Sequence, residues 1–220
     1  MPVSPLHLIL LVIGAVFLVT FIQIGALTIA FEKLGLSPHS ASLLFVTLVV
    51  GSFINLPLFS VKAEAPPPDA PVNPLNRFFR MPQIPFTGRT VISVNVGGCV
   101  TPLAFSIYLL LHNPVSLLQS LAAIATVATV SYLFSRPMPG IGIGIPILVA
   151  PLSAALAALA LNPQMSAPLA WIGGTLGVLI GADILRLKDI RKMGAPIASI
   201  GGAGTFDGIL VTGIVAVLLA

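Results

Sequence analysis

Long apolar stretches leave little of this chain for anything except membrane-spanning helices. Seven such stretches occupy roughly residues 7–31, 41–61, 91–111, 114–135, 141–162, 168–187 and 196–220. A helix needs about 20 apolar residues to cross the ~30 Å hydrocarbon core of a bilayer. Only 7% of the residues are charged, against about 25% in a soluble domain. The sequence therefore predicts an all-α, polytopic bundle of about seven transmembrane helices in the cell membrane, with the lipid bilayer as its main partner.

Prolines separate the second apolar stretch from the third. Residues 62–90 contain Pro66, Pro67, Pro68, Pro71, Pro74, Pro82 and Pro85, together with three arginines. This composition favours an extended connection over a helix. The sequence thus divides into two N-terminal transmembrane helices (1–61), a Pro/Arg-rich cytoplasmic loop (62–90) and a five-helix membrane core that carries the polar motifs (91–220).

The basic residues indicate how such a bundle is oriented. With seven crossings, one side of the membrane holds nine of them: Lys62, Arg77, Arg80, Arg89, Arg136, Arg186, Lys188, Arg191 and Lys192. The other side holds only Lys33. Because cytoplasmic loops are enriched in Lys and Arg, this asymmetry predicts a cytoplasmic N-terminus and an outside C-terminus. It also accounts for the net charge of +4 without a nucleic-acid partner.

Two aspartates interrupt the last two apolar stretches. Asp183 lies three residues before Arg186, near the cytoplasmic end of its stretch, and Asp207 follows a run of glycines. If the last helix begins near Gly201, Asp207 lies roughly 10 Å inside the cytoplasmic face. The two stretches are antiparallel neighbours, so their carboxylates can lie at similar depth and share a proton. One could then act as general base and the other as general acid, as in an aspartyl protease.

Each aspartate also has a structural interpretation. Asp183 could lie at the membrane interface or pair with Arg186, and Asp207 could cap a broken helix. We expect Asp189, beside Lys188 and Arg191, to be a solvated loop charge.

Polar and glycine-rich breaks in two stretches suggest a substrate- or ion-binding layer. Asn95, Gly97, Gly98 and Thr101 interrupt the first half of 91–111, and Gly201, Gly202, Gly204 and Thr205 precede the last helix. Both breaks are expected near the depth of Asp207. The alternative is that they only allow close packing and interhelical hydrogen bonds, as the glycines at 173, 177 and 181 are expected to do.

No signal for a metal or cofactor is present in the sequence. Three scattered histidines and a single cysteine provide no ligand cluster, and the chain contains no nucleotide-binding or nucleophile-elbow motif. We therefore expect no metal and no cofactor.

Four motifs carry a resemblance to a known family. They are Val-Asn-Val-Gly-Gly (94–98), Pro-Gly-Ile-Gly-Ile (139–143), Gly-Ala-Asp-Ile-Leu (181–185) and Ser-Ile-Gly-Gly-Ala-Gly-Thr-Phe-Asp-Gly-Ile (199–209). Over roughly residues 90–220 the chain resembles an uncharacterised family of bacterial and archaeal polytopic membrane proteins, a domain of unknown function. The resemblance implies a membrane protein and no particular activity.

A weaker likeness is to the intramembrane aspartyl proteases of the presenilin and signal peptide peptidase type. Those enzymes place one Asp on each of two adjacent helices, the second within Gly-x-Gly-Asp. Here the second motif reads Gly204-Thr205-Phe206-Asp207, Ala182 stands where presenilins have Tyr, and no Pro-Ala-Leu motif occurs.

Three functions stay open from the sequence. The chain could be a diaspartyl intramembrane protease that cleaves transmembrane peptides, with Asp183 and Asp207 as its catalytic residues. It could be a small ion- or proton-coupled transporter, because glycine-broken helices with a buried carboxylate suit cation binding. It could also be a non-catalytic membrane assembly protein. The sequence leaves the oligomeric state undecided.

Overall fold

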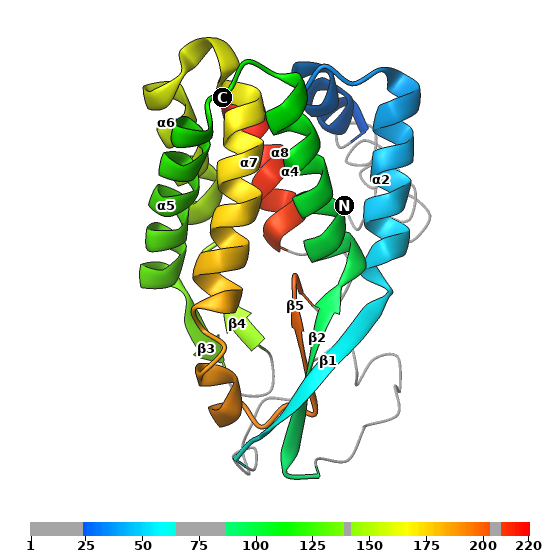
Figure 1. Ribbon diagram of the computed structural model, residues 1–220, viewed down its shortest axis with the longest axis vertical. Coiled ribbons are helices and arrows are strands. Elements are labelled where there is room, and N and C mark those ends of the chain that lie inside the picture. The colour runs from blue at the N-terminus through cyan, green and yellow to red at the C-terminus, as the bar shows by residue number, and fades with distance from the viewer. Residues whose placement is uncertain (1–23, 65–86, 139–141, 203–207) are drawn as a thin grey trace, which may run out of the picture.

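A computed structural model describes residues 24–64, 87–138, 142–202 and 208–220 as parallel and antiparallel helices with strands gathered at one end (Figure 1). The helices are Ile24–Lys33, α2 (Pro38–Ser52), α4 (Thr101–His112), α5 (Leu117–Phe134), α6 (Val149–Leu161), α7 (Ser166–Val178) and α8 (Gly208–Leu219). Two π-helical turns are η1 (Val96–Val100) and η3 (Leu179–Ile184), and two 3-10 turns are η2 (Pro163–Met165) and η4 (Asp189–Lys192).

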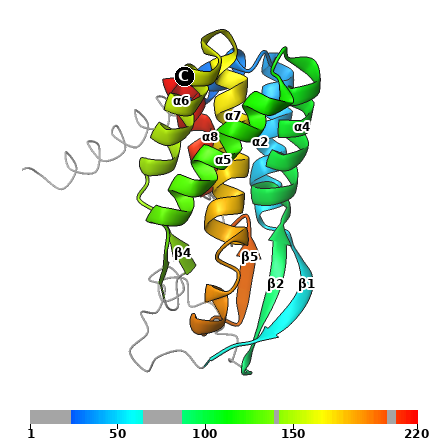
Figure 2. The same ribbon diagram turned by 60° about the vertical axis from the view of Figure 1, so that its left-hand side comes forward.

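The strands continue the helices instead of forming a separate domain. In the larger sheet, β1 (Asn55–Lys62) pairs antiparallel with β2 (Arg89–Asn95), and β2 pairs parallel with β5 (Ile197–Ile200). A smaller pair joins β3 (Arg136–Met138) to β4 (Gly142–Gly144). Figure 2 shows β1 and β2 leaving the helices as a ribbon, with β5 beside them. Because β1 follows α2 and β2 precedes α4, the pairing of the two strands fixes how these two helices lie relative to each other.

Helix α7 lies at the centre of the bundle. Trp171 and Leu169 are fully buried, and glycines allow neighbouring helices to approach closely. A Cβ added to Gly173 would lie 2.9 Å from the Ala123 Cβ on α5, and one added to Gly181 would meet the Ala128 carbonyl. The expected close helix–helix contact of these glycines is therefore confirmed, and α5 is the partner helix.

Two helical segments are long and apolar enough to cross a membrane. They are α5, with 18 residues, and the continuous segment Pro163–Ile184, with 22. At ~1.5 Å per residue they measure about 27 and 33 Å, comparable with a hydrocarbon core. The apolar helices Val96–His112, Val149–Leu161 and Gly208–Leu219 are shorter, and Ile24–Lys33 meets α2 at a bend of 113°. The described residues thus form a mainly helical, membrane-type protein in contact with lipid, while seven crossings stay a prediction.

The strands correct the expectation of an all-α protein. Four stretches predicted as helices contain a strand: 41–61 includes most of β1, 91–111 begins within β2, 141–162 contains β4, and 196–220 contains β5. Gly201 and Gly202 are described and not helical, and the described part of the last helix starts at Gly208. Hydropathy reports how apolar a segment is, whereas its conformation depends on period and residue shape. The first predicted helix, 7–31, lies mostly outside the described residues.

The basic residues that the structure describes separate as the sequence predicts. Strand β1 ends at Lys62, β2 begins at Arg89, β3 begins at Arg136, and η4 carries Arg191, all toward the strand end of Figure 1. Lys33 lies at the opposite end, where its Nζ donates to the Val217 and Leu218 carbonyls of α8 at 3.3 and 3.2 Å. Which end is cytoplasmic stays a prediction.

Candidate functional site

The two π-helical turns and the end of β5 meet at one place between the helices and the sheet. Gly201, directly after β5, packs on η1 so closely that an added Cβ would lie 2.7 Å from the Cys99 nitrogen and the Gly98 carbonyl carbon. Its own nitrogen donates to Asp183 Oδ2 on η3 at 2.7 Å. π-Helical turns are rare and occur often at functional sites. Three segments that are distant in the sequence therefore converge here.

Asp183 is the carboxylate of this junction. It lies half-buried on η3, the wider turn that continues α7 toward the strand end. A backbone N–H donated to a carboxylate stabilises its charged form and fixes the orientation of the group. The neighbouring Arg186 is held elsewhere, because its guanidinium forms a salt bridge with Asp189 at 3.1 Å. Asp189, which was predicted to be a solvated loop charge, is thus partly exposed and paired with Arg186.

Glycine is required at the end of β5. Gly201 and Gly202 have φ values of +86° and +82°, in the left-handed region that other residues rarely adopt. At Gly201 the close contact with η1 adds a second reason, since no side chain would fit. The predicted breaks around Gly98 and Gly201 thus do lie side by side. Whether they bind a substrate or an ion is a separate proposal.

Asn95 organises the helix–sheet junction. It is 1% exposed. Its Oδ1 accepts from the Gly98 nitrogen at 2.7 Å and so caps η1. Its Nδ2 donates to the Ser52 carbonyl at 2.7 Å and to Asn55 Oδ1 at 3.0 Å. Both amide hydrogens are used, so this side chain ties α2, β1 and η1 together.

Gly97 and Thr101 complete the local structure of η1. The backbone of α2 passes so close to Gly97 that an added Cβ would overlap the Leu48 carbonyl oxygen and the Ser52 nitrogen. The Thr101 hydroxyl donates to the Val96 carbonyl at 3.0 Å, across the π-helical turn. The structure therefore assigns packing and hydrogen-bonding roles to both residues, and it leaves their predicted binding role untested.

Asn55 and Ser199 are polar residues of this junction that the sequence did not single out. Asn55, at the start of β1, accepts from the Ser199 hydroxyl of β5 at 2.5 Å as well as from Asn95. This bond links the two outer strands of the sheet across β2. Only the polarity of Asn55 directly after an apolar run could have indicated it.

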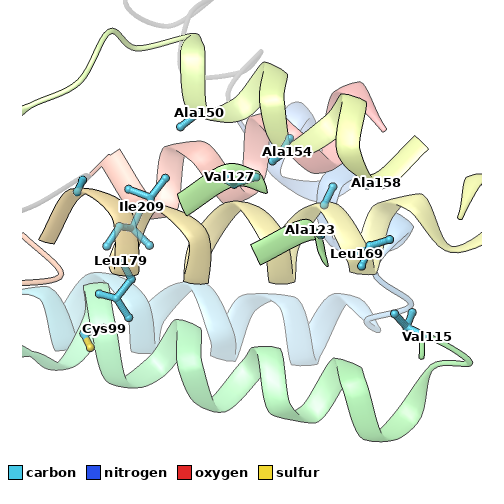
Figure 3. Close-up of a cluster of buried hydrophobic side chains, with 14 residues drawn as sticks. Cys99, Val115, Ala123, Val127, Ala150, Ala154, Ala158, Leu169, Leu179 and Ile209 are labelled. Atoms are coloured by element: carbon cyan, nitrogen blue, oxygen red, sulfur yellow. The ribbon is translucent and has the colours of Figure 1, made fainter. Parts of the chain in front are cut away.

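The remaining predicted site residues, Gly204, Thr205 and Asp207, lie outside the described residues. The chain is described again from Gly208, and Ile209 in the first turn of α8 is 2% exposed. Ile209 belongs to the same buried cluster as Cys99, Leu179 and Ala182. Figure 3 shows Cys99, Leu179 and Ile209 at the same end of this cluster. The start of α8 therefore packs against the junction that holds Asp183.

Metal ligation has little support in the described part of the chain. Within residues 24–64, 87–138, 142–202 and 208–220, no group of three or more His, Cys, Asp or Glu side chains could hold a metal ion. The side chains at the junction supply carboxylate, amide, hydroxyl and thiol groups, beside the backbone groups.

Comparison with known proteins identifies a family but no activity. The family model described as "Protein of unknown function (DUF1614)" matches residues 49–219. The match begins within α2, so it also includes the β1 strand that the motif resemblance did not reach. No curated protein and no solved structure is similar enough to match the chain. The presenilin likeness of the two aspartate motifs has no support from these comparisons.

Proposed function

Because the chain belongs to the DUF1614 family, whose function is unknown, its activity has to be inferred from its own residues. We propose that it is an intramembrane aspartyl protease in which Asp183 and Asp207 form the catalytic pair. The observation that carries this proposal is the 2.7 Å hydrogen bond from the Gly201 nitrogen to Asp183 Oδ2. It joins the first carboxylate to the glycine-rich segment that contains the second.

Chain connectivity supports the pairing. Asp207 precedes Gly208 in the chain, and Ile209, two residues after Asp207, belongs to the same buried cluster as Leu179 and Ala182. Asp183 follows Ala182 directly. The segment that directly follows Asp207 and the residue that precedes Asp183 therefore belong to one buried cluster, which supports the proposed pairing.

The proposed roles follow from the hydrogen bond to Asp183. The Gly201 N–H favours the ionised carboxylate, which suits a general base, and Asp207 then carries the shared proton as general acid. Asp183 takes a proton from water, the water oxygen attacks the peptide carbonyl carbon, and Asp207 protonates the carbonyl oxygen. When the C–N bond breaks, the amine takes the proton from Asp183, and one hydroxyl of the tetrahedral diol returns a proton to Asp207. This leaves a carboxylic acid and an amine and restores both aspartates. The proposed substrate is a helical transmembrane peptide, because the sequence predicts that Asp207 lies inside the cytoplasmic face of the membrane.

The test uses the purified full-length chain in detergent. Its probes are a fluorogenic single-span peptide and a photoreactive hydroxyethylene isostere, which mimics the tetrahedral intermediate of amide hydrolysis. We expect Asp183→Asn and Asp207→Asn each to lower cleavage by about 10²–10⁴-fold and to prevent photolabelling. Asp189→Asn is the matched control, because Asp189 pairs with Arg186 and should leave both signals unchanged. Full cleavage by either of the first two variants would refute the proposal.

A small ion- or proton-coupled transporter is the second candidate. The observation that favours it is the π-helical turn η3, which interrupts the regular helix of α7 at Asp183, since broken helices with carboxylates bind coupling ions in transporters. In proteoliposomes, solute uptake would then depend on a proton or sodium gradient and on Asp183. A protein that tolerates Asp183→Asn and Asp207→Asn in both assays would be better described as a non-catalytic membrane assembly protein.

A further inference from the structure

The ribbon of β1 and β2 ends in opposed positive charges. Lys62 and Arg89 are direct cross-strand partners at the tip, and both side chains are exposed. Like charges placed directly opposite each other destabilise a strand pair. An anion bound between them would remove this cost.

The turn η4 brings further positive charge to the same tip. The Glu64 nitrogen donates to the Arg191 carbonyl at 2.8 Å, only two residues beyond Lys62. Ile190 and Met193, on either side of Arg191 and Lys192, are buried on the sheet. We define the cationic corner as Lys62, Arg89, Arg191 and Lys192. Among the described residues, the salt bridge is between Arg186 and Asp189. Within these ranges, the four cations of the cationic corner therefore have no acidic partner.

Apolar side chains cover the ribbon between the cationic corner and the helices. Leu56, Leu58 and Phe59 on β1 are 48%, 58% and 52% exposed. β1 is an edge strand of the sheet and contains Pro57. The backbone groups on a free edge cannot lie in the hydrocarbon core, where water is absent. An apolar edge strand with a charged tip instead fits the headgroup level of a bilayer.

We propose that the β1–β2 ribbon is a docking surface for an anionic phospholipid of the adjacent leaflet. The lipid phosphate binds between Lys62, Arg89 and Arg191. An acyl chain crosses the free edge of β1 to Leu58 and Phe59, because the register places Phe59 on the other face of the ribbon from Lys62. Charge complementarity selects an anionic headgroup, because Arg and Lys form charge-assisted hydrogen bonds with phosphate oxygens. The exposed apolar face of β1 selects a lipid over a soluble phosphate. This site lies on the opposite side of β2 from β5 and does not depend on the proposed protease activity.

The single cysteine offers a direct measurement of lipid binding. Cys99 is buried and is the only cysteine of the chain. A maleimide dye therefore reacts as the protein unfolds on heating. The full-length chain in uncharged detergent is titrated with phosphatidylglycerol, phosphatidylcholine or glycerol 3-phosphate. We expect phosphatidylglycerol alone to raise the unfolding temperature, because ligands that bind the folded state stabilise it.

Matched variants locate the effect. Lys62→Gln/Arg89→Gln/Arg191→Gln should weaken the apparent phosphatidylglycerol affinity by at least about tenfold. Lys33→Gln, at the opposite end of the molecule, should leave it unchanged. Leu58→Ser/Phe59→Ser should weaken it through the acyl contact, whereas Leu118→Ser, on the exposed far end of α5, should not. The measurement is the lipid-induced shift within each variant, so a less stable variant still gives a valid result.

Three results would overturn the proposal. They are an unchanged shift in the triple variant, an equal loss in Lys33→Gln, and equal shifts with phosphatidylcholine or glycerol 3-phosphate. The first would place the lipid elsewhere, the second would reduce the effect to net charge, and the third would remove the need for an anionic lipid.

Discussion

Arg186 shows how one residue can connect the ends of two neighbouring helical segments. Its Nη2 donates to the Tyr132 and Ser135 carbonyls at 2.8 and 2.9 Å, at the C-terminus of α5. Its Nε donates to the Ser135 hydroxyl at 3.1 Å, and its guanidinium carbon lies 4.3 Å from the centre of the Tyr132 ring. A cation at a helix C-terminus also complements the helix dipole. The planar guanidinium makes all of these contacts at once, which a lysine cannot do.

Arg186→Lys should therefore destabilise the protein although the charge is kept. The variant loses the fork of hydrogen bonds to α5, and we expect a cost of about 1–3 kcal/mol. Lys188→Gln, an exposed neighbour, is the control and should change stability by less than about 0.5 kcal/mol. Thermal unfolding followed by Cys99 labelling provides the measurement. Equal midpoints for Arg186→Lys and the wild type would contradict this role.

Asn95 gives a second prediction at the residue scale, because its Oδ1 accepts one hydrogen bond and its Nδ2 donates two others. Asn95→Asp keeps an oxygen for the Gly98 nitrogen but loses both donors to Ser52 and Asn55. It also places a carboxylate at a fully buried position, which costs more than losing neutral hydrogen bonds. We expect Asn95→Asp to be less stable than Asn95→Ala at neutral pH. The reverse order in denaturation experiments would show that the η1 cap outweighs the contacts of the amide nitrogen.

At the scale of elements, the contact between α2 and η1 sets the position of the sheet. Gly51 on α2 and Gly97 on η1 bring the two backbones together, and a Cβ added to Gly51 would lie 2.9 Å from the Gly97 nitrogen. Both β1 and β2 begin or end within a few residues of this contact. Because the contact is between backbones, rotation of a side chain cannot relieve an added methyl group. This contact also fixes the geometry of the junction between η1, η3 and the end of β5, since Asn95 and Gly98 lie within two residues of Gly97.

Gly97→Ala should consequently separate α2 from η1. We expect a loss of stability of about 1–3 kcal/mol, typical of overpacking in a well-packed interior. Gly25→Ala is a matched control, because its Cβ would meet nothing within 4 Å. If the proposed active site depends on this junction, Gly97→Ala should also lower cleavage without direct contact with either aspartate. A variant as stable as Gly25→Ala would mean that the two backbones can move apart freely.

At the scale of the whole molecule, sequence reasoning succeeded where a single quantity decides the outcome. Apolar length located α5 and the Pro163–Ile184 segment, and the basic residues indicated which ends of the helices lie together. It failed at residues 89–95, where Thr90, Val91 and Ile92 are β-branched and buried positions nearly alternate with exposed ones. Hydropathy alone does not distinguish such a segment from the start of an apolar helix. Its strand conformation depends on pairing with β1 and β5, which local hydropathy does not contain.

The same limit applies to the candidate site. Asp183 and the break around Gly201 could be singled out because charge and glycine are unusual within apolar stretches. Their hydrogen bond could not be predicted, since it requires β5 to end beside η3. Asn55 and Ser199 were missed because single amide or hydroxyl residues within an apolar stretch are ordinary. Their importance arises only when the sheet brings β1, β2 and β5 together.

The orientation of the whole molecule in the membrane gives the last prediction. The basic strand end should face the cytoplasm and the end that carries Lys33 should face outside, because Lys and Arg are retained on the cytoplasmic side. In a Cys99→Ala background, Lys192→Cys and Lys33→Cys place one exposed thiol at each end. In intact cells a membrane-impermeant maleimide should label Lys33→Cys and reach Lys192→Cys only after the membrane is permeabilised. Labelling of Lys192→Cys in intact cells would invert the orientation, and with it the leaflet that supplies the lipid for the β1–β2 ribbon.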